Sequence, residues 1–138
     1  MFSAVFLLCR NRALAEDATQ EAFARAFERW ARLAPVPWAG AWVTTTALNV
    51  ARRSLRRRVL PLPRSWSSPT DDAVDLWDSV ARLPRRQQEA VILHYRLGTP
   101  IDEIAEVMGC QAGTVRTHLA RARQALREAL KEDPSHGS

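Results

Sequence analysis

A proline- and serine-rich stretch divides this sequence in two. Residues 59–70, VLPLPRSWSSPT, contain three prolines and three serines and show no helical period, which is typical of a linker. In a chain of 138 residues this leaves two segments of roughly 60 residues, a size at which a domain buries only about 60% of its unfolded surface. The sequence therefore predicts two small lobes, residues 1–58 and 71–131, followed by a tail, residues 132–138.

The N-terminal lobe has the apolar spacing of helices. Two stripes with i, i+4, i+7 spacing run along it: Phe2, Phe6 and Cys9 in the first, and Phe23, Phe27 and Trp30 in the second. We expect the second stripe to face the core of the lobe. A third helix is predicted to begin at Pro37, a residue suited to a first helical turn, and to run through WAGAWVTTTALNVARRSLRRR.

The C-terminal lobe carries clearer helix start and stop signals. Thr70 is expected to cap a helix with an acidic first turn, TDDAVDLWDSVARL. The next helix is expected within PRRQQEAVILHYRLG, which is bounded by proline and glycine. In TPIDEIAEVMG we expect Thr99 to be the N-cap, Pro100 the first helical residue and Asp102 the acid of a capping box. Both lobes are thus predicted to be all-α.

The last helix has one apolar and one polar face. Its predicted buried stripe is Val115, Leu119, Ala122 and Leu126, opposed by the outward residues Arg116, Thr117 and Arg121 with Thr114 and His118 at the rim. We expect the stripe to pack on Ile101, Ile104 and Ala105 of the preceding short helix, with Cys110 in the turn between them. This arrangement predicts a helix-turn-helix whose Arg and Thr side chains can reach base edges in a major groove. A solvated arginine face on an ordinary bundle helix is the alternative.

The net charge of +5 is unevenly distributed. Residues 1–64 hold 11 arginines and 4 acidic residues, whereas residues 65–138 hold 9 basic and 11 acidic residues. Nineteen of the 20 basic residues are arginine, which suits phosphate recognition because the planar guanidinium binds phosphate oxygens in pairs. Codon bias would give the same composition, so the charge alone does not decide between them.

Within this basic lobe, AEDATQEAF places three polar residues on one helix face. Asp17, Gln20 and Glu21 have i, i+3, i+4 spacing. A patch of this kind keeps a surface away from DNA and suits a basic protein partner. It is equally compatible with an ordinary solvated helix start.

Several classes of function have no support in the sequence. Cys9 and Cys110 lie 101 positions apart without CxxC spacing, and the three histidines complete no metal site, so neither metal nor cofactor is predicted. His94 and His118 have no evident catalytic partner, and no phosphate loop is present, so neither an enzyme nor a small-molecule substrate is predicted. The apolar N-terminus lacks the order of a signal peptide and the length of a membrane span, so a cytoplasmic location without membrane insertion is expected.

Two parts of the chain together resemble a known family. Residues 83–128, LPRRQQEAVILHYRLGTPIDEIAEVMGCQAGTVRTHLARARQALRE, resemble region 4 of the bacterial extracytoplasmic-function (ECF, group 4) sigma factors of the sigma-70 family. AEDATQEAFARAF resembles region 2.2 of the same family, and AWVTTTALNVARRSLRRR resembles regions 2.3 and 2.4. Trp42, Asn49 and Arg56 fall on the family's Trp, Asn and Arg positions. The resemblance covers about residues 1–130 in the family's order.

The resemblance implies two helical domains, sigma-2 and sigma-4, and a role in promoter-specific transcription initiation. It implies that Asp17, Gln20 and Glu21 bind a coiled coil of core RNA polymerase. The residues that it assigns to −10 DNA are Trp38, Asn49, Arg52, Arg53, Arg56 and Arg57, although Trp38 and Trp42 are also candidates for the core. Those assigned to −35 DNA are Thr114, Arg116, Thr117, His118, Arg121 and Arg123. An anti-sigma factor is the other partner implied.

The match departs from the family at two places. Relatives have a further helix before the one that starts here at Met1, and many carry Ser-Arg where this chain has Thr117 and His118. Two other functions therefore stay open at this point. One is a helix-turn-helix regulator that does not bind polymerase, and the other is a truncated, sigma-like decoy for an anti-sigma factor.

Overall fold

The computed structural model describes residues 2–58 and 71–132, so the predicted linker, with the predicted cap Thr70 at its end, and most of the predicted tail lie outside the described residues. Every regular element in these two ranges is helical, which confirms the all-α prediction. The elements are α1 (Phe2–Cys9), α2 (Arg12–Glu28), α3 (Trp30–Leu33), α4 (Ala39–Arg58), α5 (Asp71–Ala81), α6 (Arg85–Val91), the π-helical turn η1 (Ile92–Arg96), α7 (Ile101–Met108) and α8 (Ala112–Glu132).

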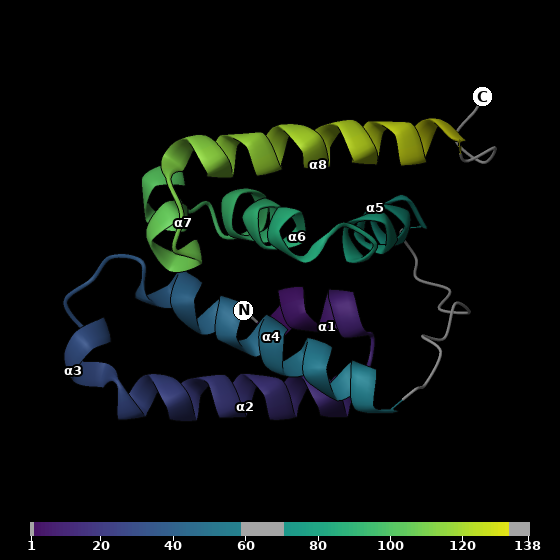
Figure 1. The fold of residues 1–138 in the computed structure, drawn as a ribbon. Coiled ribbons are helices and arrows are strands. Elements are labelled where there is room, and N and C mark those ends of the chain that lie inside the picture. Colours follow the sequence, from purple (N-terminus) through teal and green to yellow (C-terminus); the bar gives the residue numbers. More distant parts are fainter. Residues whose placement is uncertain (1, 59–70, 133–138) are drawn as a thin grey trace.

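Two residues connect α1 to α2. Arg10 has a left-handed backbone conformation, with φ of 51°, which ends α1. The Asn11 side chain then caps α2, because its Oδ1 accepts a hydrogen bond of 3.1 Å from the backbone N–H of Leu14. This short joint brings α1 back against α2 and α4 (Figure 1).

Alanines, and not the aromatic stripe, form the buried face of α2. The buried residues of this helix are Leu14, Ala15, Ala18, Ala22 and Ala26, and they face α4. The prediction that Phe23, Phe27 and Trp30 look to the core is wrong, because their side chains are 56%, 83% and 57% exposed. The reason is geometric: a row of alanines at i, i+4, i+8 lets two helices approach closely, which turns the bulky stripe outward.

The helix predicted from Pro37 begins two residues later. In α4 the first helical hydrogen bond runs from the Trp42 N–H to the Trp38 carbonyl, at 3.0 Å. Thr44 and Thr46 each return a hydroxyl hydrogen bond of 2.9 Å to the carbonyl four residues before, which satisfies these side chains within the helix. The helix therefore continues through the threonines, as the flanking pattern predicted.

The C-terminal lobe follows the predicted order with one wrong cap. α6 continues into η1 and stops at Gly98, whose φ is 69°. Thr99 is not the N-cap of α7: that position is Pro100, which makes no side-chain cap, and the predicted capping box is absent. Thr99 instead lies buried, with its N–H bonded to the Leu93 carbonyl at 2.9 Å. The proline already fixes the extended backbone needed before the helix, so a capping hydroxyl is not required.

The two lobes lie against each other in this structure. α1 packs on α5, and α4 packs on α7, so the N-lobe helices form one layer below the C-lobe helices (Figure 1). Polar side chains join the layers: Arg10 is ion-paired with Asp78, and Arg96 donates to the Ser3 hydroxyl at 2.7 Å. The expectation of two helical units is met, and they adopt a closed arrangement that the sequence did not predict.

Candidate nucleic-acid interface

The helix-turn-helix is built by α7, a glycine turn and α8. Gly109 ends α7 in the left-handed region, with φ of 68°, and the Cys110 N–H closes the turn on the Ala105 carbonyl at 3.0 Å. α8 begins at Ala112, so only three residues separate the helices. α7 packs on α8, and Ile104, Val115 and Leu119 are fully buried in the core. The apolar pattern thus holds α8 with its opposite face outward.

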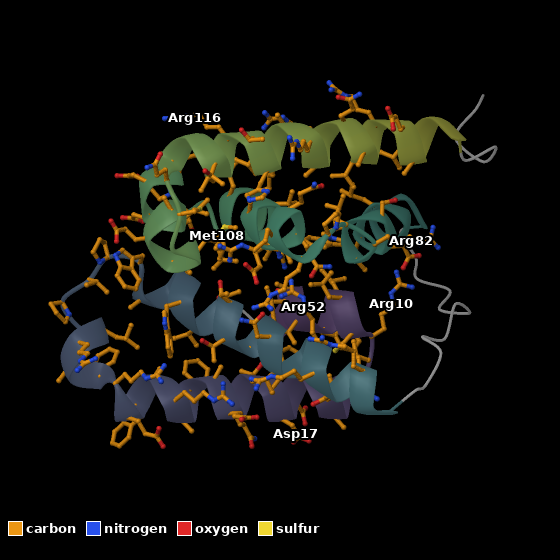
Figure 2. All side chains as sticks on the ribbon, viewed as in Figure 1. Arg10, Asp17, Arg52, Arg82, Met108 and Arg116 are labelled. Carbon is orange, nitrogen blue, oxygen red and sulfur yellow. The ribbon has the colours of Figure 1, made fainter. Side chains whose placement is uncertain are left out.

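The outward face of α8 carries most of the predicted −35 residues. Thr114, Arg116, Thr117 and Arg121 are exposed in the N-terminal half of the helix, and Figure 2 shows Arg116 pointing away from the molecule. The Thr117 hydroxyl donates to the Gly113 carbonyl at 3.1 Å, which leaves both lone pairs of its oxygen free to accept. This face presents guanidinium and hydroxyl groups at the end of the helix that could enter a major groove.

Two predicted −35 residues have different surroundings. Arg123 lies about two helical turns after Arg116 and donates to the Tyr95 hydroxyl at 2.8 Å, over a groove between α5, η1 and α8. His118 is half-buried, and its Nδ1 has no hydrogen-bond partner among the described residues. Burial, with Arg86 and Arg121 adding to it, lowers the pKa of His118. His118 is therefore neutral at neutral pH, unlike the arginines around it.

The predicted −10 residues on α4 divide into two groups. Arg53 and Arg56 are exposed, and within the described parts of the chain neither has a hydrogen-bond or ion-pair partner. Arg52 is turned toward the other lobe, and Asn49 accepts a hydrogen bond from it at 2.9 Å. The side chain of Arg57 lies outside what the structure describes. Trp38 is half-buried against the core at the start of α4.

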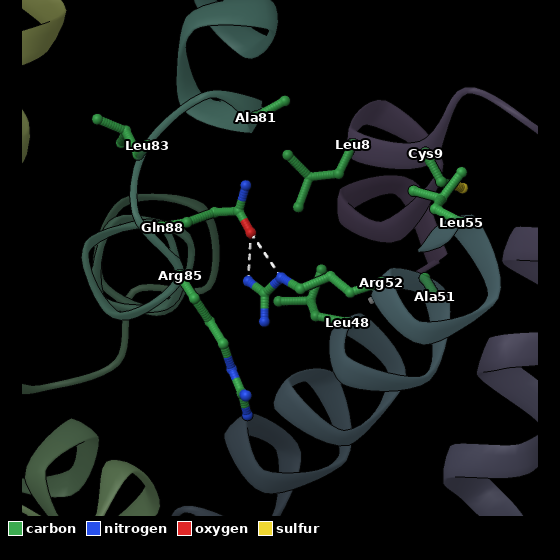
Figure 3. Close-up of a pocket in the computed structure, with 10 residues that line it drawn as sticks. All are labelled: Leu8, Cys9, Leu48, Ala51, Arg52, Leu55, Ala81, Leu83, Arg85 and Gln88. Atoms are coloured by element: carbon green, nitrogen blue, oxygen red, sulfur yellow. Dashed lines mark hydrogen bonds between the residues drawn. The ribbon is translucent and has the colours of Figure 1, made fainter. Parts of the chain in front are cut away.

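Arg52 forms the centre of the contact between the lobes. Its Nε donates to Gln88 Oε1 at 2.8 Å, and its Nη2 bonds to the same oxygen (Figure 3). Its Nη1 pairs with Glu89 Oε1 at 3.1 Å. The Arg52 side chain is only 18% exposed, and that of Glu89 is 1% exposed. Burial is the main reason that the pKa of Arg52 lies below its ordinary value, while the Glu89 charge opposes the shift.

Glu89 is the residue that sequence reasoning missed. Besides Arg52, it accepts from Arg85 at 3.2 Å and from Arg86 at 3.3 Å, within its own helix. The only signal in the sequence was the placement of Arg85 and Arg86 four and three residues before a glutamate, which is common on exposed helices. Its burial follows from tertiary packing. A cavity of about 240 Å³ lies beside this cluster, lined by Leu8, Cys9, Leu48 and Leu83 among others (Figure 3).

The predicted protein-binding patch lies on the outer face of α2. Asp17, Gln20 and Glu21 are all exposed, and Figure 2 shows Asp17 on the side of α2 away from the C-terminal lobe. Glu21 also pairs with Arg25 at 2.6 Å. The exposed Phe23 and Phe27 lie on the same helix. The structure thus brings an acidic and an aromatic surface together, well separated from the polar face of α8 (Figure 2).

Two features are absent from residues 2–58 and 71–132. Among these residues, no group of three or more His, Cys, Asp or Glu side chains is placed to hold a metal ion. In the same ranges, no helix combines the length and the apolarity needed to cross a membrane.

Comparison with known proteins assigns both lobes to one family. The family model described as Sigma-70 region 2 matches residues 1–59, and that described as Sigma-70, region 4 matches residues 73–126. The chain is 31% identical over 136 residues to the ECF RNA polymerase sigma factor SigC of Mycobacterium tuberculosis, with 89% of this chain and 74% of that protein covered. It is 32% identical over 126 residues to the RNA polymerase sigma-E factor of Streptomyces coelicolor, with 84% and 71% covered.

A solved structure also has this arrangement of helices. It is the co-crystal structure of the sigma factor RpoE in complex with the anti-sigma factor NepR from Bartonella quintana. The TM-score is 0.70 at 25% identity, and the match covers 96% of this chain and 90% of that one. Because both lobes are included in one superposition, the closed arrangement itself is similar to that of the sigma factor bound to its anti-sigma factor.

Proposed function

This chain belongs to the ECF RNA polymerase sigma factors of the sigma-70 family, and from that premise we propose how its surfaces divide the work of promoter-directed transcription initiation. It binds core RNA polymerase through α2 and directs it to promoters, where α8 reads the −35 element and α4 contacts the −10 region. It contributes no catalytic group, since polymerase performs the chemistry, and it acts in the cytoplasm with polymerase. An anti-sigma factor is its regulatory partner.

One observation carries the proposal. A single chain presents the Asp17, Gln20 and Glu21 patch on α2 and, on a separate lobe, a helix-turn-helix whose exposed arginines and threonines lie at the N-terminal half of α8. A regulator that only binds DNA has no use for the first surface. A decoy for an anti-sigma factor has no use for the second. Only a subunit that links a protein to DNA uses both.

The first surface accounts for the choice of residues on α2. An acidic patch repels DNA phosphates and attracts a basic protein surface, so it orients the subunit on its partner. The adjacent exposed Phe23 and Phe27 add apolar area that a protein partner would cover. The second surface supplies guanidinium groups for guanine edges and phosphates, and threonine for the thymine methyl group.

The test is a pull-down with core RNA polymerase. We expect the wild-type chain to be retained, and Asp17→Arg/Glu21→Arg to be lost, because both substitutions reverse charge in the patch. Glu128→Arg is a matched control: it reverses one exposed charge near the end of α8, far along the chain from the patch. If the wild-type chain shifts promoter duplex but does not bind polymerase, the chain is a DNA-only regulator and the proposal fails.

A further inference from the structure

A second cavity lies where α4 of the N-terminal lobe meets α6 of the C-terminal lobe. It has a volume of about 290 Å³ and is lined by Asn49, Arg53, Arg56 and Arg85. Three of these residues come from α4, and Arg85 extends toward α4 from the other lobe (Figure 3). The cavity therefore exists only while the lobes are closed. A water molecule occupies about 30 Å³ in the liquid, so there is room for a group of several heavy atoms.

The positive charges around this cavity outnumber the anions beside them. Among the described residues, Arg53 and Arg56 have no acidic partner, and Arg85 uses only its Nε, toward Glu89. Arg52 lies next to them, and Arg85 and Arg56 both add to the lowering of its pKa that burial causes. Glu89 is shared by Arg52, Arg85 and Arg86, so one carboxylate faces three guanidinium groups. An anion in this space would relieve the crowding of like charges.

The lining selects the class of anion. It has no apolar or aromatic side chain, so it offers nothing to a nucleobase or a hydrocarbon. Its guanidinium forks bind oxygen pairs on phosphate groups, and the amide of Asn49 can donate as well. Arginines from two lobes on opposite sides of a cavity suit an anion with more than one phosphate group, because each lobe can hold its own.

We propose that the closed protein binds linked phosphate groups in this cavity, with Arg53 and Arg56 on one side and Arg85 on the other. The bound anion bridges the lobes and occupies two arginines that the proposed function assigns to −10 DNA. It thus favours the closed arrangement and competes with promoter binding. A free condensed phosphate and the backbone of a nucleic acid have the same chemistry here. The site goes beyond the proposed function and requires no polymerase.

The experiment is a calorimetric titration of the full chain with tripolyphosphate at low ionic strength. We expect one anion per chain and an affinity that falls roughly tenfold or more in Arg85→Gln, the loss of one charge-assisted contact. Arg82→Gln is the matched control, because it removes the same charge from an exposed arginine just before α6, outside the cavity lining. It should change the affinity by less than about twofold, the effect of a screened distant charge.

Because Arg85 also contacts Glu89, Arg85→Gln could weaken binding through an effect on folding, and a second variant separates the two effects. Arg56→Gln alters the other lobe at an exposed side chain without a partner among the described residues, and it should weaken tripolyphosphate as Arg85→Gln does. A parallel titration with a short oligothymidylate identifies the source: dependence on Arg85 and Arg56 for that probe alone assigns the site to a nucleic-acid backbone. If all three variants weaken both probes equally, binding is diffuse attraction and the proposal is overturned. The polymerase pull-down is independent of either result.

Discussion

At the scale of single residues, the buried carboxylate of Glu89 organises the contact between the lobes. It is 1% exposed and pairs with Arg52, Arg85 and Arg86. We expect Glu89→Gln to lower the free energy of unfolding by about 3 kcal/mol, because the largely buried guanidinium group of Arg52 loses its anion. The half-exposed Arg85 and Arg86 also lose that contact but keep access to water. Urea unfolding monitored by circular dichroism measures this change. Glu128→Gln, at an exposed position on α8, should stay within about 0.5 kcal/mol, and an equal loss there would contradict the account.

His118 gives the stability of the protein a dependence on pH. Burial and the nearby Arg86 and Arg121 lower its pKa in the folded state, with Glu89 opposing them, so the unfolded chain binds a proton more readily. Stability therefore rises with pH through the window between the lowered pKa and the ordinary value near 6.5, and is lost below it. We expect the melting temperature of the wild type to fall further than that of His118→Gln between pH 7.5 and 5.5. A parallel fall in both proteins would show that His118 does not titrate abnormally.

At the scale of the element, the packing of α2 tests which of its faces is internal. Ala22 is fully buried against α4, whereas the Phe27 ring is largely in solvent. We expect Ala22→Leu to destabilise the protein by about 1–3 kcal/mol, because the larger side chain forces the two helices apart. Phe27→Gln should change stability by less than about 0.5 kcal/mol. Chemical denaturation of both variants measures the difference. A larger loss of stability in Phe27→Gln than in Ala22→Leu would show that the aromatic stripe faces the core.

The outer face of α8 makes a separate prediction about specificity. Arg116 is exposed at the N-terminal half of the helix, where a guanidinium group can reach a base edge. We expect Arg116→Gln to lose about 1–3 kcal/mol of affinity for the promoter duplex and little for a scrambled duplex. Arg127→Gln, on the same helix beside the Tyr95 groove, should weaken both duplexes to the same small extent. Titrations at one fixed salt concentration give the ratio of the affinities for promoter and scrambled duplex. If Arg116→Gln leaves this ratio unchanged, Arg116 has no role in base recognition.

The contrast between α8 and α2 shows what the sequence could predict. In α8 the large apolar residues fall on one face and the polar residues on the other, so the sequence identifies one face as buried and the opposite face as exposed. In α2 two stripes compete, one of alanines and one of aromatic residues, and periodicity alone does not rank them. The alanine stripe is buried because α2 and α4 approach closely, and this approach is visible only in the tertiary structure. The hydrogen bond from Thr99 to Leu93 and the π-helical turn after Val91 likewise depend on tertiary packing, so the sequence did not predict them.

At the scale of the whole molecule, the closed arrangement explains why a predicted −10 residue is not on the surface. The family resemblance predicts that Arg52 binds −10 DNA, yet here its guanidinium group binds Gln88 and Glu89 of the other lobe. Its exposed neighbours Arg53 and Arg56 remain available in the closed form. The family resemblance and the basic run assigned all three to DNA, and neither indicates that Arg52 faces the other lobe. The structure instead gives Arg52 internal partners in the closed form.

The same contact predicts how the balance between closed and open forms can be shifted. Arg52→Ala removes the hydrogen bonds to Gln88 and Glu89 across the interface, while Glu89 keeps Arg85 and Arg86 and the C-terminal lobe stays folded. We expect the lobes to separate more often, which raises the radius of gyration measured by small-angle scattering. Arg53→Ala is the control, because it removes the adjacent arginine without a described contact to the other lobe.

Salt distinguishes this release from general unfolding. Arg52 and Glu89 are largely shielded from solvent, whereas the Asp78 side chain of the second ion pair between the lobes, with Arg10, is 40% exposed. Screening should therefore weaken the Arg10 pair more than the Arg52 pair. In the wild type, raised salt should expand the molecule only slightly. In Arg52→Ala the exposed pair carries more of the contact, so the same salt should expand it further with no loss of helix by circular dichroism. If Arg52→Ala and Arg53→Ala have equal radii of gyration at every salt concentration, apolar packing of α1 on α5 holds the lobes together. The contacts of Arg52 then contribute nothing to the closed form.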